Sequence, residues 1–551
     1  MNRTVLAALV SALSTLSPEL LSSQGPATTP PKSSTQETTT ASPSKLDLGA
    51  LLRDRAVTLV RASKLFAPGV GGSESTYVDG KGHWLVYKDG VVLGIVKEPN
   101  EPVEIPQNEL KARLLDYTKD HPGCVATPGF VDADSRWFRN PGDLADRSAD
   151  ATAPAKDGLE TWQEGADELL QKAGITTLFV PANAESQASG SGAVVTLTTR
   201  TPTVLADGAG QWRLSSPKTR GTSLTRANVV KGLQGALEAA RKYDEAKEKH
   251  KKDVAEFEKK RKEFLDYYKK NPLKKGEKVE ESKPQRAPRS RGGRLPRTKE
   301  ELEKMLERVP PAMRDRIRAN IEAQMKARDE AEKKEGGDAK EEKKDDKDAK
   351  KAPAKPNRPK EPDVDPAKES MLRVLAGKET LRVEVHRAEE IRALVDLLEE
   401  EGIDRVTILG GTEAYKVAKE LRTIDALVVL RPEDLPETGF DTMPEHLAAS
   451  AKALSDEGIA VAFGSAGTTS GRGLPFHAAR AVAFGMRERD ALQALTRGGI
   501  DAAGVGDEPV DTGIVVWSGD PLATTSNPVL LVRGRRVREL GKGGDAASED
   551  K

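Results

Sequence analysis

Three side chains with the chemistry of a hydrolytic or metal site lie at the ends of short apolar runs. Asp132 and Asp134 belong to TPGFVDADSRW, residues 127–137, and His386 ends LRVEVH. Carboxylates and imidazoles bind divalent metals and exchange protons. Arg136 binds no metal, because its guanidinium is always protonated and has no lone pair to offer. The sequence leaves two interpretations open for the aspartates: a pair for acid–base work, or strand-end residues bonded to Arg136 or to backbone amides, which we favour.

The apolar pattern predicts an α/β fold to position these residues. Residues 159–173 have the spacing of an amphipathic helix, and the buried strand ITTLFVP follows. After residue 372 the strands LRVEVH, RVTILGG, DALVVL and IAVAFG alternate with helical segments. Repeated strand–helix units predict a parallel sheet with helices outside it. Their number favours a (β/α)8 barrel of the TIM type.

Both ends of this region have a different pattern, that of short strands and turns. Residues 56–96 contain AVTLVRA, WLVYKDG and VVLGIVK, and Lys88-Asp89-Gly90 has the composition of a hairpin turn. The segments GIVVWSGD and PVLLVRGRRV near the C-terminus have the same pattern of short strands and turns. We therefore predict one small β-sandwich domain built from both chain ends.

The middle of the chain breaks the alternation. Residues 240–270 are mostly charged, as expected for a solvated, coiled-coil-like helix with intrahelical ion pairs, and Phe257, Phe264, Leu265 and Tyr268 could form a weak apolar stripe. A second helical segment is predicted over residues 300–334. Residues 330–362 have a composition typical of disorder. Together these features predict a long charged insertion into the barrel.

The N-terminal residues have the layout of a secretory signal peptide. Arg3 precedes a short apolar stretch, and a Ser/Thr/Pro-rich spacer follows. The single cysteine, Cys124, excludes an intramolecular disulfide, so the core must stabilise the fold. The predicted organisation is a signal peptide over residues 1–25, a linker over 26–50, a composite β domain over 56–127 plus 505–540, a barrel over 128–240 plus 367–504, and the insertion over 241–366.

Several of these segments resemble those of the amidohydrolase superfamily, in its imidazolonepropionase-like branch, and occur in the same order. TPGFVDADSRW is similar to the family's TPGLIDAHSH segment, VEVHRAEEIRALVDLLEEEG to its fifth-strand segment, VTILGGTEAYKVAKEL to its sixth and AVAFGSAG to its eighth. DTGIVVWSGDPL and VRGRRV resemble its closing β segment. The resemblance covers residues 56–240 and 372–538. It implies one or two divalent metals at the C-terminal ends of the barrel strands, which activate water against an amide-like C–N bond.

Most positions that would bind this metal are substituted, according to the resemblance. The family's first-strand histidine pair falls on Asp134 and Arg136, and its sixth-strand histidine falls on Gly410. Its general base on the eighth strand falls on Ala466. His386 matches the fifth-strand histidine, although a strand-end histidine satisfied by hydrogen bonds is the favoured interpretation. Asp134 and His386 are thus the only remnants, and two ligands rarely hold a catalytic metal.

We expect an exported amidohydrolase-family protein, periplasmic or in the cell envelope, with a degenerate metal site and weak or no catalysis. No cofactor is expected, or zinc or iron if activity is retained. The alternatives are a non-catalytic binding or scaffold protein, which uses the barrel cleft for a small molecule and the insertion for a protein partner, and metal-free hydrolysis through Asp134. Lys+Arg and Asp+Glu both number 87, so no net charge favours nucleic acid. No transmembrane segment is expected in the mature chain.

Overall fold

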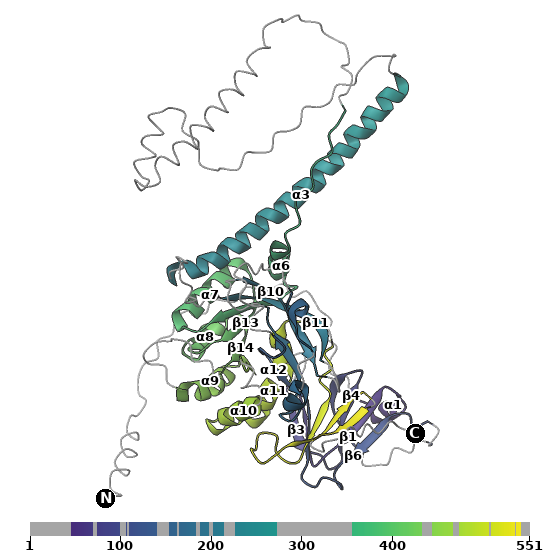
Figure 1. The fold of residues 1–551 in the computed structure, drawn as a ribbon, viewed down its shortest axis with the longest axis vertical. Helices are drawn as coiled ribbons and strands as arrows, with labels where there is room; N and C mark the ends of the chain where they lie inside the picture. The colour runs from purple at the N-terminus through teal and green to yellow at the C-terminus, as the bar shows by residue number, and fades with distance from the viewer. Residues whose placement is uncertain are drawn as a thin grey trace, which may run out of the picture.

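The structure is a computed structural model. It describes residues 46–69, 74–99, 106, 109–139, 154–161, 165–182, 188–197, 202–213, 226–272, 355–431, 444–466, 473–505, 509–534 and 536–540. The strands of these residues form sheets of four, six and eight strands. In Figure 1 the two smaller sheets lie at one end of the molecule and the largest sheet lies in the middle with its helices. The predicted signal peptide, the first part of the linker and the helix over 300–334 lie outside the described residues.

The two smaller sheets pack against each other. One has the order β5-β4-β1-β6, and its strands are β1 (Val57–Arg61), β4 (His83–Lys88), β5 (Val91–Lys97) and β6 (Arg113–Asp116). The other has the order β18-β17-β16-β7-β2-β3, with β2 (Lys64–Ala67), β3 (Thr76–Asp79), β7 (Val125–Pro128), β16 (Ile514–Trp517), β17 (Pro528–Arg533) and β18 (Arg536–Glu539). Leu85 and Tyr87 of the first sheet share a buried cluster with Ile514 and Val516 of the second.

Strands from both ends of the chain meet in the six-stranded sheet, where β16 pairs antiparallel with β7. In the four-stranded sheet the predicted hairpin joins β4 and β5, and both Asp89 and Gly90 have positive φ, as a two-residue hairpin turn requires. Helix α1 (Leu48–Leu52) covers this sheet's other face, where Leu48 packs with Leu59 and Trp84.

The eight-stranded sheet follows chain order from β8 to β15. Its strands are β8 (Phe130–Asp132), β9 (Ile175–Val180), β10 (Ala188–Thr196), β11 (Thr203–Arg213), β12 (Leu381–Val385), β13 (Arg405–Gly410), β14 (Asp425–Leu430) and β15 (Ala460–Phe463). The two ends of this order also meet, because the amide of Ala133 donates a hydrogen bond of 3.0 Å to the carbonyl of Phe463.

One strand departs from the predicted repetition of parallel strands. β10 pairs antiparallel with both β9 and β11, whereas the remaining strand pairs of this sheet are parallel. The connections that flank β10 are residues 181–187 and 197–202. Each is shorter than the roughly dozen residues that a crossover between parallel strands needs, so the chain must turn back. The strict strand–helix alternation is therefore wrong at β10.

The helices that flank this sheet bury apolar side chains. They are α2 (Ala166–Gln171), α7 (Ala388–Glu401), α8 (Ala418–Leu421), α9 (Pro444–Asp456), α10 (Leu474–Ala483), α11 (Glu488–Leu495) and α12 (Arg497–Ala503). The helix predicted over residues 159–173 is shorter than expected, since Leu159 forms a β-bridge with Arg139 and α2 begins at Ala166. In α7 the stripe of Ile391, Leu394, Val395 and Leu398 is buried, and Gly402 ends the helix with a φ of 68°. None of the described helices is both long and apolar enough to cross a membrane.

A long helix, α3 (Arg226–Lys270), lies between β11 and β12 in the chain. Its first half is anchored, because Leu233, Leu237 and Ala240 are buried in the main core. Farther along, Tyr243 donates a hydrogen bond to Glu369 of α6 (Pro366–Leu375). The predicted start of the insertion, Arg241, lies inside this continuous helix. Its second half projects beyond the sheets and is mostly exposed (Figure 1).

Candidate functional site

The residues that the sequence singles out lie at the carboxyl ends of strands in the eight-stranded sheet. Asp134 follows β8, His386 follows β12, Gly410 ends β13 and Ala466 follows β15. The chain reaches β8 directly from β7 of the six-stranded sheet through Gly129. A Cβ at position 129 would lie 2.0 Å from Oγ1 of Thr176, so only glycine permits this crossing between sheets. The segment TPGFVD therefore connects the two sheets and presents Asp134.

The carboxylate of Asp134 is neutralised by a buried arginine. Nη2 of Arg431, at the end of β14, forms an ion pair with Oδ2 of Asp134, and both side chains are 4% exposed. Nη1 of the same guanidinium lies 3.6 Å from Oε2 of Glu384 on β12. Arg431 thus bridges carboxylates from the first and fifth strands. We call Asp134, Glu384, His386 and Arg431 the ion cluster.

Arg136 does not join this cluster, because its side chain is exposed. The chain leaves the sheet at this point: the amide of Ser135 donates to the carbonyl of Phe179 at 2.8 Å, and the next residues to enter the core are Trp137 and Phe138. Of the two partners left open for Asp134, Arg136 or backbone amides, Arg136 is therefore wrong. An aspartate–arginine pair exists, but its cation comes from the seventh strand.

Asp132 fixes the end of β8 to the loop after β15. It is fully buried and accepts hydrogen bonds from the amide and the hydroxyl of Ser465, at 2.9 and 2.6 Å, and from the amide of Asp134 at 3.2 Å. Burial raises the pKa of Asp132 to about 6, against the opposing effect of these hydrogen bonds. The bonding to backbone amides that we favoured for the aspartates is thus found at Asp132.

His386 fills the space that a side chain at position 410 would need. Its ring is buried, with Nδ1 2.8 Å from Oγ1 of Thr412 and Nε2 3.9 Å from Oε1 of Glu384. A Cβ at position 410 would lie 2.2 Å from Cε1 of this ring, and Gly410 has a φ of 83°. Because of this overlap, His386 in this position and a histidine at 410 are mutually exclusive.

A second buried arginine, Arg382 of β12, lies beneath the ion cluster. Its guanidinium stacks on the ring of Phe179 at 3.8 Å and donates to the carbonyls of Ala502 and, at 3.2 Å, Ala133. Desolvation lowers the pKa of Arg382 to about 9. Two buried carboxylates, those of Asp134 and Glu384, are thus matched by two buried guanidinium groups.

Arg382, Glu384 and Arg431 were not predicted as site residues. A signal was present, because Arg382, Glu384 and His386 alternate in the otherwise apolar segment LRVEVH and must share one face of the strand. A charged residue in a strand that is buried on both faces needs an oppositely charged or hydrogen-bonding partner. Arg431 gives a similar signal, since it directly follows the buried strand DALVVL.

These residues do not fit a catalytic metal. The described part of the chain contains no group of three or more His, Cys, Asp or Glu side chains arranged to hold a metal ion. One oxygen each of Asp134 and Glu384 faces the guanidinium of Arg431, which cannot coordinate a cation. Nδ1 of His386 is engaged with Thr412. A metal would have to displace Arg431 from both carboxylates.

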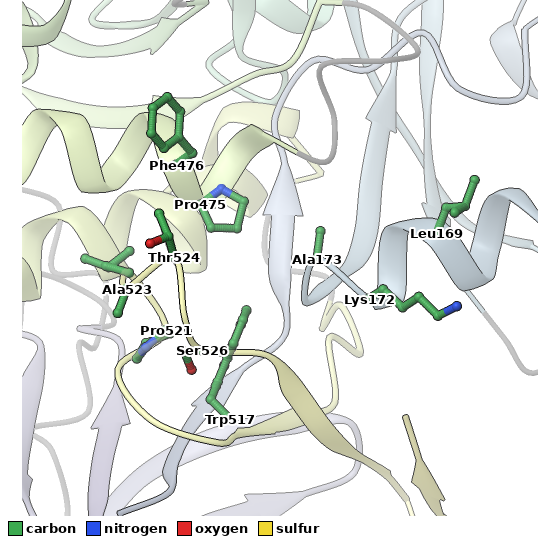
Figure 2. A pocket seen from close by; sticks show the side chains of 11 residues that line it. Leu169, Lys172, Ala173, Pro475, Phe476, Trp517, Pro521, Ala523, Thr524 and Ser526 are labelled. Carbon is green, nitrogen blue, oxygen red and sulfur yellow. The ribbon is translucent and has the colours of Figure 1, made fainter. Parts of the chain in front are cut away.

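A cavity of about 340 Å³ lies apart from the ion cluster, between α2, α10 and the loop after β16. Figure 2 shows it beside the indole of Trp517, with Phe476 and Pro475 of α10 across from the loop. It is lined by Leu169, Lys172, Ala173, Pro475, Phe476, Trp517, Pro521, Leu522, Ala523, Thr524 and Ser526. Within the described residues, the buried hydroxyl of Ser526 has no hydrogen-bond partner. The cavity is therefore mainly apolar, with one unsatisfied polar group.

No protein-family model matches the sequence, and no curated protein sequence matches it significantly. Solved structures do. An amidohydrolase from Thermotoga maritima matches with 18% identity and a TM-score of 0.50, over 87% of this chain and 98% of that one. The ochratoxinase of A. niger matches with 13% identity and a TM-score of 0.40, over 90% and 98% of the two chains. The chain therefore has an overall fold like that of the Thermotoga amidohydrolase.

Proposed function

We propose that this is an amidohydrolase-family protein, related to hydrolases of non-peptide C–N bonds, in which an internal ion network has replaced the metal centre and catalysis is weak or lost. The observation that carries the proposal is the buried guanidinium of Arg431 between Asp134 and Glu384. It supplies a fixed positive charge where the family resemblance implies a bound cation. The imidazolonepropionase-like branch remains part of the proposal.

The proposal includes closure of the eight-stranded sheet as a TIM-like barrel with one reversed strand. Two sets of contacts support closure. The amide of Ala133 after β8 donates to Phe463 of β15, and the amide of Ala466 donates to the carbonyl of Asp134 at 2.8 Å. The hydrogen bonds between Asp132 and Ser465 join the same two strand ends. In such a barrel the ion cluster would fill the mouth.

The chemistry that hydrolysis requires is missing from the cluster. A hydrolase needs a group that takes a proton from the attacking water, but the position of the family's general base is Ala466. Asp134, which could act without a metal, is 4% exposed in its side chain and ion-paired, so water and substrate have little access to it. We therefore place metal-free hydrolysis through Asp134 behind the inactive-site proposal.

Metal analysis of the purified full-length protein tests the proposal. We expect far less than one zinc or iron per chain after dialysis, and no change on replacement of His386 by alanine. A matched variant, Arg431→Met, removes the cation but keeps similar bulk. Stoichiometric metal in the wild type that is lost in His386→Ala would overturn the proposal. Turnover of cyclic amides that is lost in Asp134→Asn but resists chelators would instead support metal-free hydrolysis.

A binding role is the second candidate function, and the cavity beside Trp517 favours it. Its apolar lining and the unsatisfied hydroxyl of Ser526 suit a small apolar ligand with one hydrogen-bonding group. The fluorescent probe anilinonaphthalene sulfonate reports on such a site. We expect Phe476→Ala to weaken its binding and Phe484→Ala to leave it unchanged, since both rings are about half-exposed but only Phe476 lines the cavity. Equal binding by both variants would contradict this role.

We also propose that the protein is exported to the periplasm or cell envelope. The N-terminal sequence pattern supports this, with Arg3 before a short apolar stretch. Expression in the native host followed by N-terminal sequencing tests it. A mature N-terminus near residue 25 in the envelope fraction is expected, and a cytoplasmic protein that retains residues 1–25 would contradict it.

A further inference from the structure

The outer half of α3 carries a mainly apolar stripe in a heptad pattern, which also includes the polar side chains of Lys247 and His250. The stripe consists of Tyr243, Lys247, His250, Val254, Phe257, Phe264 and Tyr268, whose spacings of four, three, four, three, seven and four residues follow one face of a supercoiling helix. These side chains are buried or half-buried, whereas most of their neighbours are exposed. Leu265, which was predicted to belong to the stripe, is 55% exposed and lies outside this stripe.

The inner end of this stripe contacts α6. Tyr243 and Lys247 contact Glu369 of α6, at 2.9 and 2.7 Å. Beyond them the helix projects past the sheets for another 23 residues, to Lys270 (Figure 1). At 1.5 Å per residue this is about 35 Å of helix. A mainly polar helix with an apolar seam over this length fits a coiled-coil partner.

We propose that residues 300–328 of the same chain dock on this stripe, antiparallel to α3. Chain connectivity sets the direction. α3 ends at Lys270, far from the body, and α6 begins at Pro366 beside Tyr243. The intervening chain therefore connects the outer end of α3 to a point beside its inner half, a return that an antiparallel segment provides. The tether also keeps this segment at a local concentration that a separate chain would not match.

The apolar residues of the segment match the stripe in length and spacing. Leu302, Leu306, Val309, Met313, Ile317 and Ile321 recur every three or four residues. Pro310 and Pro311 divide them into a first part, 300–309, and a second part, 312–328. The combined length is close to that of residues 244–270 of α3.

The charges of the two segments are complementary in the antiparallel direction only. Residues 244–258 of α3 carry six acidic and four basic side chains, net −2, and residues 259–270 carry two acidic and six basic side chains, net +4. In the returning segment, residues 300–309 carry four acidic and two basic side chains, net −2, and residues 312–328 carry two acidic and five basic side chains, net +3. A parallel arrangement would oppose like charges.

Lysine cross-linking of the full-length protein with mass spectrometry tests the proposal. We expect Lys304 to link to Lys259, Lys260 or Lys262, and Lys326 to link to Lys247, Lys249 or Lys251. An equal mixture of ¹⁵N-labelled and unlabelled protein distinguishes the two sources of a partner helix. Links within one isotopic chain support the proposal. Links between isotopes, the reversed order of links, or no links between these segments would overturn it.

A matched pair of double variants checks that the stripe itself holds the segment. Val254→Asp with Phe264→Asp places charges on the stripe, whereas Ala255→Asp with Leu265→Asp places them on exposed neighbouring positions of the same helix. We expect the first variant to lose the links at least about tenfold and the second to keep them. Equal loss or equal retention in the two variants would show that the stripe is not the docking face.

Discussion

Replacing Arg431 by methionine tests whether its guanidinium holds the ion cluster together. The change keeps much of the side-chain volume but leaves the carboxylates of Asp134 and Glu384 buried opposite an apolar group. The side chains of Arg431, Asp134 and Glu384 are 4%, 4% and 10% exposed, so water cannot replace the lost partner. Removing one member of a buried ion pair costs about 3–5 kcal/mol of folding free energy. We expect a loss of this size at pH 7.

A surface pair provides the control. Arg392 of α7 lies 3.1 Å from Glu420 of α8, and their side chains are 56% and 38% exposed. Because solvent screens this pair, Arg392→Met should cost no more than about 1 kcal/mol. Urea denaturation followed by far-ultraviolet circular dichroism measures both variants. The double variant Arg431→Met, Asp134→Asn should be less destabilised than the sum of the single changes, since the amide removes an uncompensated charge.

Two outcomes would refute the reasoning. A loss for Arg431→Met no larger than that for Arg392→Met would show that the cluster is not a buried charge network. Strict additivity of Arg431→Met and Asp134→Asn would show that these two residues do not interact. Either result would reopen the question of a metal between Asp134 and Glu384.

Two further predictions concern neighbouring positions. Burial raises the folded-state pKa of Asp132 from 3.8 to about 6, so protonation favours the folded state. The stability of the wild type relative to Asp132→Asn should therefore increase by about 2 kcal/mol as the pH falls from 7 to 4; a stability difference that is constant with pH in paired urea titrations would contradict this. Gly410→Ala should cost at least about 1 kcal/mol more than Gly377→Ala in the same assay, since both glycines have positive φ but only position 410 would bring a Cβ against His386; equal losses would mean that His386 moves aside freely.

The sequence predicted which residues lie at strand ends, but it did not predict which residues they contact. Asp134 and His386 lie at strand ends because apolar runs of strand length precede them, which is a local signal. The sequence offered Arg136, the nearest cation, or backbone amides as partners of Asp134. The partner is Arg431, because the ends of β8 and β14 converge only after the five intervening strands, β9 to β13, have been arranged. Pairing between distant strands is a property of the assembled sheet.

The antiparallel direction of β10 could have been predicted from the lengths of the connections on either side of it. Apolar content identified residues of β9 as a strand, and the same criterion cannot distinguish parallel from antiparallel neighbours. The lengths of the connections can, since residues 181–187 and 197–202 leave no room for a crossover helix. The sequence did not show that α3 continues across Arg241, because the inner half of this helix is apolar and its outer half is charged. The composition therefore changes inside one continuous helix.

The pairing of β7 with β16 has a consequence for the order in which the chain can fold. During synthesis the residues of β7 emerge from the ribosome long before those of its antiparallel neighbour, Ile514–Trp517. Until then β7 has only β2 beside it, and β8, which continues directly from β7 through Gly129, lacks a fixed base. Such distant contacts are slow to form. A nascent chain that stops before residue 514 should therefore remain sensitive to proteases in both sheets, because β16, β17 and β18 are needed to complete the six-stranded sheet.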